Sequence, residues 1–134
     1  MLIALSVSGL GAALAWRAYT VRQDARGDEM IVVPFERVQH TAMKPPEYNS
    51  RATYNIEPRF AVRRRHEEEF RRLVDFHRPA IMDALQTLLT KVHYLRFLNG
   101  EEPGPGMALQ IRTEVNRVIG REWVEDVTFL GPGQ

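Results

Sequence analysis

The apolar and polar positions begin with one continuous apolar run. Residues 2–16 contain no charged side chain. A helix of this length is roughly 22 Å long, whereas the hydrocarbon core of a bilayer is ~30 Å thick. Extended to Val21, the helix reaches roughly 30 Å and places Arg17 and Trp16 at the membrane boundary. We therefore predict a transmembrane anchor over residues 1–21 and a charged spacer over residues 22–29.

The apolar run has two other interpretations. One is a secretory signal peptide cleaved after Ala15, although no Lys or Arg precedes the run as such peptides require. The other is a buried helix of a soluble domain, which its Gly- and Ser-containing turns disfavour. Within the predicted anchor, the small residues Ala4, Ser8 and Ala12 recur every four positions. That spacing suits close packing between helices in lipid.

Two segments after the spacer have the alternation and composition of β-strands. Residues 30–38 are rich in β-branched side chains, and residues 52–62 alternate apolar with polar positions. Pro34 cannot donate a hydrogen bond to a neighbouring strand, so the first strand should be an edge strand or carry a bulge there. Pro58 should interrupt or bulge the second strand. We predict a hairpin whose turn, over residues 41–50, is unusually long.

The rest of the chain predicts helices and a closing strand. Phe70, Leu73, Val74 and His77 share one helical face, and the stripe resumes after Pro79, either in a new helix or in one helix kinked there. Residues 92–97 predict a short strand or an irregular segment. A helix built around Leu109 to Ile119 should end at Gly120, and residues 123–129 predict a strand. The predicted fold is α+β, with a small sheet packed on helices over residues 30–134.

A charge cluster marks the start of the first helix. Arg63, Arg64 and Arg65 precede Glu67 and Glu68. The cluster suits a phosphate site, but a solvated helix start explains it better. Glu67 and Glu68 each stand four residues before an arginine, and acids in a first helical turn favour the helix dipole. We take these five residues as a candidate interaction surface.

Composition and spacing disfavour most other chemistry. The 18 Lys+Arg nearly balance the 17 Asp+Glu, which is unsuited to a general nucleic-acid binder. With no cysteine, the chain has no thiol chemistry or cysteine-ligated metal. The four histidines lack metal-ligand spacing, and no nucleophile or phosphate-loop motif occurs. We expect no catalytic residue, metal or cofactor, and a protein that acts by interaction.

The second half resembles the FliL proteins, single-span membrane proteins of the flagellar basal body. That family has an arginine-proline-x-isoleucine-x-aspartate stretch leading a leucine-rich helix, and later a V-x-x-V-x-F strand. The start at residues 32–35 is also similar to the family's first strand. The matching residues of this chain are Arg78, Pro79, Ile81, Asp83, Leu109, Asn116, Val124, Val127 and Phe129.

The resemblance implies a stomatin-like periplasmic domain on a bacterial inner-membrane anchor. It implies a ring-like homo-oligomer that associates with flagellar stator proteins and supports torque generation and motility, with no enzymatic activity. Three arginines that follow the anchor oppose this orientation, namely Arg17, Arg22 and Arg26. The positive-inside rule would place them, and the domain after them, in the cytoplasm. Two alternatives are a membrane-anchored accessory or ligand-binding domain unrelated to flagella, and a cytoplasmic-facing adaptor, which the arginine positions favour.

Overall fold

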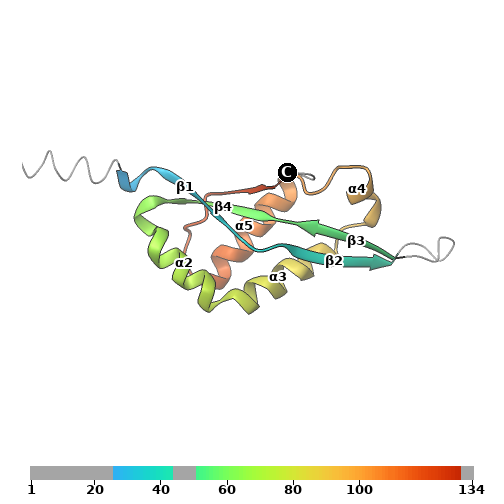
Figure 1. The fold of residues 1–134 in the computed structure, drawn as a ribbon, viewed down its shortest axis with the longest axis horizontal. Helices are drawn as coiled ribbons and strands as arrows, with labels where there is room; N and C mark the ends of the chain where they lie inside the picture. The colour runs from blue at the N-terminus through green and yellow to red at the C-terminus, as the bar shows by residue number, and fades with distance from the viewer. Residues whose placement is uncertain (1–25, 44–50, 131–134) are drawn as a thin grey trace, which may run out of the picture.

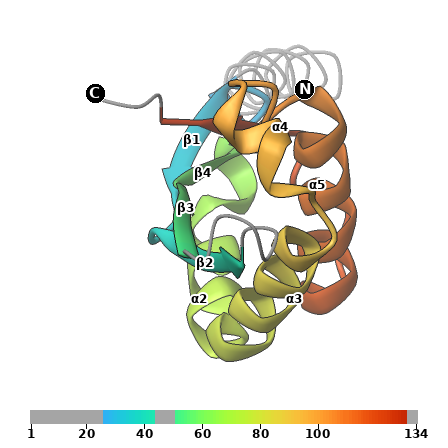
Figure 2. The ribbon, with the colours of Figure 1, turned by 90° about the vertical axis from the view of Figure 1, so that its right-hand side faces the viewer.

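The strands and helices of the chain form two layers. The computed structural model describes residues 26–43 and 51–130, and Figure 2 shows the strands on one side of it and helices α2, α3 and α5 on the other. This is the predicted α+β class, with a small sheet packed on helices (Figure 1). In chain order the elements are β1 (Met30–Pro34), β2 (Val38–Met43), β3 (Arg51–Ile56), β4 (Pro58–Arg63), the 3₁₀ turn η2 (Arg64–His66), α2 (Glu67–Phe76), α3 (Arg78–Thr90), α4 (Tyr94–Leu98), α5 (Pro105–Ile119) and β5 (Asp126–Phe129).

The predicted hairpin is present and is bent in the middle, but its first arm runs to Met43, into the segment predicted as turn. β1 pairs antiparallel with β4, and β2 pairs antiparallel with β3. β4 also pairs with β5, giving a three-stranded sheet in the order β1-β4-β5. β1 is therefore an edge strand, as the proline at its end predicted.

A bulge separates the two halves of the hairpin. The N–H of Phe35 continues the β1 register by donating to Pro58 at 3.0 Å, and Val38 then pairs with Ile56. Glu36 and Arg37 thus lie opposite Glu57 alone, so the first strand has one extra residue. The extra residue lets Phe35 and Val38, three positions apart, both enter the core.

The structure selects one of the two arrangements predicted around Pro79 and differs from the prediction after residue 91. α2 ends before His77 and α3 begins at Arg78 with Pro79 in its first turn, so these are two helices rather than one kinked helix. Residues 92–97, predicted as a short strand or an irregular segment, instead contain a helix from Tyr94 onward. A short helix, α4, begins there because the side chain of His93 accepts a hydrogen bond from the N–H of Leu95 at 3.2 Å and caps it.

α5 contains the predicted helix and ends as predicted, at a left-handed Gly120 with φ 70°. It begins earlier than expected, at Pro105. Its buried face is made by Met107, Ile111, Val115 and Ile119. Leu109, expected on that face, is 59% exposed because it falls on the opposite side of the helix.

The core lies between the three-stranded sheet and the helices. Its fully buried centre joins Phe60 of β4 to Phe70 of α2, whose rings meet edge to face at 6.0 Å. Other large, fully buried side chains are Ile81, Leu85, Leu89, Ile111, Val62, Val115 and Val124. Every main helix thus contributes to one core.

The predicted anchor over residues 1–21, with Ala4, Ser8, Ala12 and Trp16, lies outside the described residues. Among the helices that the structure describes, none has the length and apolar character needed to cross a bilayer.

Candidate functional site

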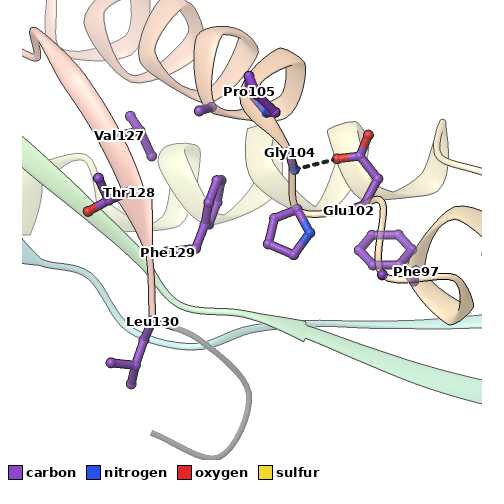
Figure 3. Close-up of a pocket in the computed structure, with 11 residues that line it drawn as sticks. Phe97, Glu102, Gly104, Pro105, Val127, Thr128, Phe129 and Leu130 are labelled. Carbon is purple, nitrogen blue, oxygen red and sulfur yellow. Dashed lines mark hydrogen bonds between the residues drawn. The ribbon is translucent and has the colours of Figure 1, made fainter.

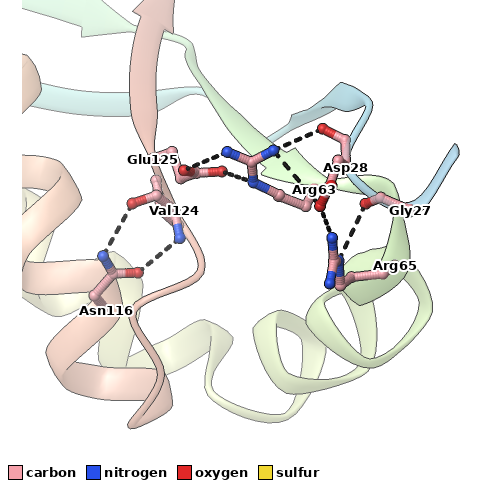
Figure 4. A network of polar contacts seen from close by, with 7 residues as sticks. All are labelled: Gly27, Asp28, Arg63, Arg65, Asn116, Val124 and Glu125. Atoms are coloured by element: carbon pink, nitrogen blue, oxygen red, sulfur yellow. Dashed lines mark hydrogen bonds and ion pairs between the residues drawn. The ribbon is translucent and has the colours of Figure 1, made fainter. Parts of the chain in front are cut away.

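Two arginines of the predicted interaction surface hold the end of the spacer against the sheet. Arg63 donates to the backbone oxygen of Asp28 at 2.9 Å and lies 2.9 Å from a carboxylate oxygen of Glu125 (Figure 4). Arg65 pairs with the Asp28 carboxylate and donates to the backbone oxygen of Gly27 at 3.4 Å. We call Arg63, Arg65, Asp28 and Glu125 the arginine clamp. It joins the chain before β1 to the residue before β5, across the end of β4.

The other residues of that predicted surface differ in their pairing. Arg64 pairs with Glu29 at 3.1 Å. Glu67 pairs with Arg71 at 3.1 Å, as expected, but the predicted pair of Glu68 with Arg72 is wrong. Arg72 instead lies 3.7 Å from Glu69, one turn back at a three-residue spacing, and Glu68 is exposed with no partner among the described residues. Much of the predicted surface is therefore engaged within its own chain.

A second contact, between aromatic rings, brings η2 to the same place. The ring of His66 stacks on Trp123 with centroids 4.3 Å apart and planes 9° apart. The guanidinium of Arg121 lies 5.7 Å from the same Trp123 ring. The segment before β5 is thus held both by the arginine clamp and by a stacked ring.

The first residue of the family-like stretch, Arg78, joins three elements. Its guanidinium lies 2.7 Å from Asp75 and 3.1 Å from Glu36, and 5.1 Å from the centre of the Phe35 ring. The hydrogen bond to Asp75, with a second one to Glu36, raises the pKa of Arg78 above its ordinary value. A base with a raised pKa stabilises the fold below that value and stops doing so only as the pH rises through it, so Arg78 stays charged throughout the neutral range.

Asn116 holds the other end of the family-like stretch together. It is 3% exposed, the only buried polar or charged residue among the described ones. Its amide nitrogen donates to the backbone oxygen of Val124 at 3.0 Å, and its amide oxygen accepts from the Val124 N–H at 2.9 Å (Figure 4). We call this pair of bonds the Asn116 tie. It fixes the turn after α5 so that Val124 enters the core.

The remaining family-like residues divide between the core and the surface. Pro79 lies in the first turn of α3, and Ile81 of the same helix is buried. Val124 and Val127 are buried and Phe129 is half-buried against the core. Asp83 and Leu109 are exposed. Asp83 lines a hollow of about 390 Å³ between α3 and α5, together with Lys91, Glu114 and Arg117.

A second hollow, of about 520 Å³, lies beside β5. Its walls are β5 on one side and the loop between α4 and α5 on the other, with Phe97, Pro103 and Phe129 supplying apolar surface (Figure 3). The Glu102 carboxylate accepts from the N–H of Gly104 at 2.9 Å and pairs with Arg96 at 2.9 Å. This carboxylate therefore shapes the loop. No histidine lines the hollow.

The three-stranded sheet has two edges that no described strand covers. On β1, Glu29 and Phe35 bond to β4, so by alternation the N–H and C=O groups of Met30 and Val32 face away from it. Pro34 follows the same alternation, and its missing N–H therefore falls on the free edge. On β5, Leu130 bonds toward Glu57 of the chain before β4, so the backbone groups of Val127 and Phe129 face the other free edge.

One backbone donor on the free edge of β5 is already bonded within the chain. The Asp126 carboxylate accepts from the N–H of Val127 at 2.9 Å, which occupies one of the outward donors. Sequence reasoning identified neither this contact nor the clamp acids Asp28 and Glu125.

In the described residues, His, Asp and Glu side chains form no group of three that could hold a metal ion. Comparison with family models, curated proteins and solved structures finds no match to this chain.

Proposed function

We propose that this chain is a non-enzymatic, single-span inner-membrane protein resembling FliL. Its C-terminal domain lies in the periplasm, assembles with copies of itself into a ring and associates with flagellar stator proteins to support torque generation. The anchor over residues 1–21 places it in the bilayer. Small residues at positions 4, 8 and 12 pack against a neighbouring helix.

The observation that carries this proposal is the order of the family-like residues from Arg78 to Phe129. The structure supplies a physical reason for the least expected of them. A polar residue at a core position of α5 is costly unless its hydrogen bonds are satisfied. Asn116 satisfies them on both backbone groups of Val124, the first valine of the family-like strand.

The arginine clamp supports an anchored role. It ties residues 27–28, at the end of the spacer, to β4 and to the start of β5. A spacer that entered the domain freely would let the domain rotate about it. The clamp instead sets one direction of entry, as a domain that must present fixed edges to neighbours requires.

The first experiment is a topology assay with C-terminal alkaline phosphatase and fluorescent-protein fusions in the same host. Phosphatase activity without fluorescence places the domain outside the cytoplasm and supports the proposal. Fluorescence without phosphatase activity contradicts the proposal and favours the cytoplasmic adaptor. In the source bacterium, deletion should reduce swimming speed, and the tagged chain should co-purify with stator subunits. Normal swimming together with no co-purification would overturn the flagellar role.

The hollow beside β5 favours one second candidate, a membrane-anchored ligand-binding domain unrelated to flagella. Its walls are largely apolar, with Phe97 and Phe129 facing a proline-rich loop. Under this alternative, a small apolar probe such as 8-anilinonaphthalene-1-sulfonate should bind the folded domain, and Ala108→Trp, which fills the hollow, should abolish that binding. Swimming should then be unaffected by the same variant.

A further inference from the structure

The two free edges of the three-stranded sheet differ in sequence and in the side chains beside them. β1 presents Met30 and Val32, whose side chains are 42% and 53% exposed on the open face of the sheet. β5 presents the backbone of Val127 and Phe129, whose side chains face the helices. An uncovered edge is a template for another strand. Because the edges differ, pairing one with the other is a head-to-tail contact.

The directions of the strands fit such a contact. β1 runs antiparallel to β4, and β4 runs antiparallel to β5, so β1 and β5 run in the same direction. A second copy placed beside the first, with its helices on the same side, would lay its β1 parallel to β5 of the first. No inversion of the second copy is needed.

The alternation of backbone groups fits as well. In a parallel pair, a residue whose groups face the partner bonds to the two residues flanking the one directly opposite. For the two edges to pair in this way, the β5 residues whose backbone groups face the edge must carry side chains on the helix side. The β1 residues whose backbone groups face the edge must carry side chains on the open face. Val127 with Met30 and Val32 meets this condition.

We infer that this chain self-assembles by adding β1 of one copy, in parallel, to β5 of the next. Thr128 lies opposite Val32 of the neighbouring copy. The N–H of Val127 exchanges its bond to the Asp126 carboxylate for one to Met30, Val127 accepts from Val32, and Phe129 donates to Val32. The ladder ends at Pro34, which has no N–H to offer. This inference rests on the self-assembly in the proposed function and names the surfaces that carry it out.

Three features of the described residues support a second copy as the occupant. Glu29 pairs with Arg64 and Glu125 with Arg63 within the chain, so Asp126 of β5 is the one acid beside these edges without a cation partner among the described residues. The hollow of about 520 Å³ leaves space on the helix side of β5. The edges themselves belong to one sheet, so each copy supplies both halves of the contact, as repeated addition requires.

The test uses the full chain in detergent micelles, and its lack of cysteine makes engineered cysteines unambiguous. Val32→Cys and Thr128→Cys should form a disulfide between copies on mild oxidation. The double variant should give a ladder of cross-linked multimers, and a mixture of the two single variants should give only mixed dimers. The matched control pairs Thr128→Cys with Arg72→Cys, on the exposed side of α2, and should give no cross-link.

A second variant separates assembly from folding. Val32→Pro removes an N–H that faces the free edge and makes no bond to β4, so the thermal midpoint of the domain should stay the same. Self-association, measured by analytical ultracentrifugation, should weaken by about tenfold or more, the effect of losing one hydrogen bond and inserting a ring into the contact. Val32→Thr keeps the N–H and should assemble normally.

Three results would overturn the inference. Dimers from Thr128→Cys or Val32→Cys alone would mean that like edges pair with each other. Oligomers without any of these cross-links would mean that another surface assembles the chain, while the proposed self-assembly survives. A monomer at all concentrations would overturn both the edge pairing and the ring. None of these results depends on topology or motility. A failure of the flagellar role would therefore appear in the topology and swimming assays and not in the cross-linking.

Discussion

The Asn116 tie and the arginine clamp hold neighbouring parts of the chain by different means. Both act on the segment before β5, the tie at Val124 and the clamp at Glu125 (Figure 4). The tie is neutral and lies in the core, with Asn116 3% exposed. The clamp is charged and open to water, with the side chains of Arg63, Asp28 and Glu125 between 39% and 51% exposed.

The difference predicts where each contact matters. Breaking a buried hydrogen bond leaves its partner unsatisfied, which costs more than the bond itself contributed. Breaking an exposed ion pair returns both groups to water, which costs little and less in salt. The tie therefore governs stability, and the clamp governs how the spacer enters the domain.

The largest expected effect is at the tie. Asn116→Ala should lower the free energy of unfolding by about 2–4 kcal/mol, because the N–H and C=O of Val124 then lose their partners. Urea unfolding of residues 26–134 measures it. Gln110→Ala, at an exposed position of the same helix, is the control and should change stability little. A loss below about 1 kcal/mol for Asn116→Ala would show that water replaces the tie.

A buried polar group without a partner should behave in the opposite way. The hydroxyl of Tyr54 is buried and finds no hydrogen-bond partner in the described residues. Tyr54→Phe should raise the free energy of unfolding by about 1 kcal/mol, since it removes an unsatisfied group and keeps the ring stacked on Phe97 at 4.5 Å. Tyr54→Leu loses the stacking and should destabilise. Destabilisation by Tyr54→Phe would mean that the hydroxyl has a partner in the folded protein.

The clamp should give a smaller, salt-dependent effect. Arg63→Gln should lower the free energy of unfolding by about 0.5–1 kcal/mol at low ionic strength, and the difference should largely vanish in 1 M salt, where the screening length is about 3 Å. Arg59→Gln is the matched control, from the same face of β4, and forms no ion pair with a described residue. An equal loss in both variants would show that lost packing of the arginine stem, and not charge pairing, is responsible.

The smallest effect separates two acids of one helical turn. Glu67→Gln should cost about 0.3–0.5 kcal/mol more than Glu68→Gln, because Glu67 alone pairs with Arg71 while both acids favour the helix dipole. Thermal unfolding at low salt measures the difference. Equal losses would mean that the dipole accounts for the whole effect.

The local features of this fold could be predicted from the sequence because they depend on neighbours. Alternation placed the hairpin, Pro34 identified an edge strand with a bulge beside it, and Gly120 marked the end of α5. The short strand or irregular segment expected near residue 94 is instead helical because the apolar positions there fit a single helical turn equally well. That turn is decided by one capping contact from His93.

The candidate site was less accessible because it depends on residues far apart in the sequence. The Arg63–Asp28 contact spans 35 positions and the Arg63–Glu125 contact spans 62. The charge cluster indicated a solvated helix start, and nothing local showed that its arginines reach the spacer. Asn116 was identified only through the family-like pattern. A polar residue beside the apolar stripe of α5 is the one signal that could have marked it.

The bulge at Glu36 and Arg37 has a genetic consequence. Because these two residues lie opposite Glu57 alone, loss of one codon here would restore a regular ladder and leave Val33, Phe35 and Val38 all facing the core. Loss of a codon within β2 would instead turn every later side chain of that strand to the other face. In this hairpin, the first arm can therefore lose a single residue at the bulge without changing which side chains face the core. We expect natural gain and loss of residues in the first arm to concentrate at those two positions.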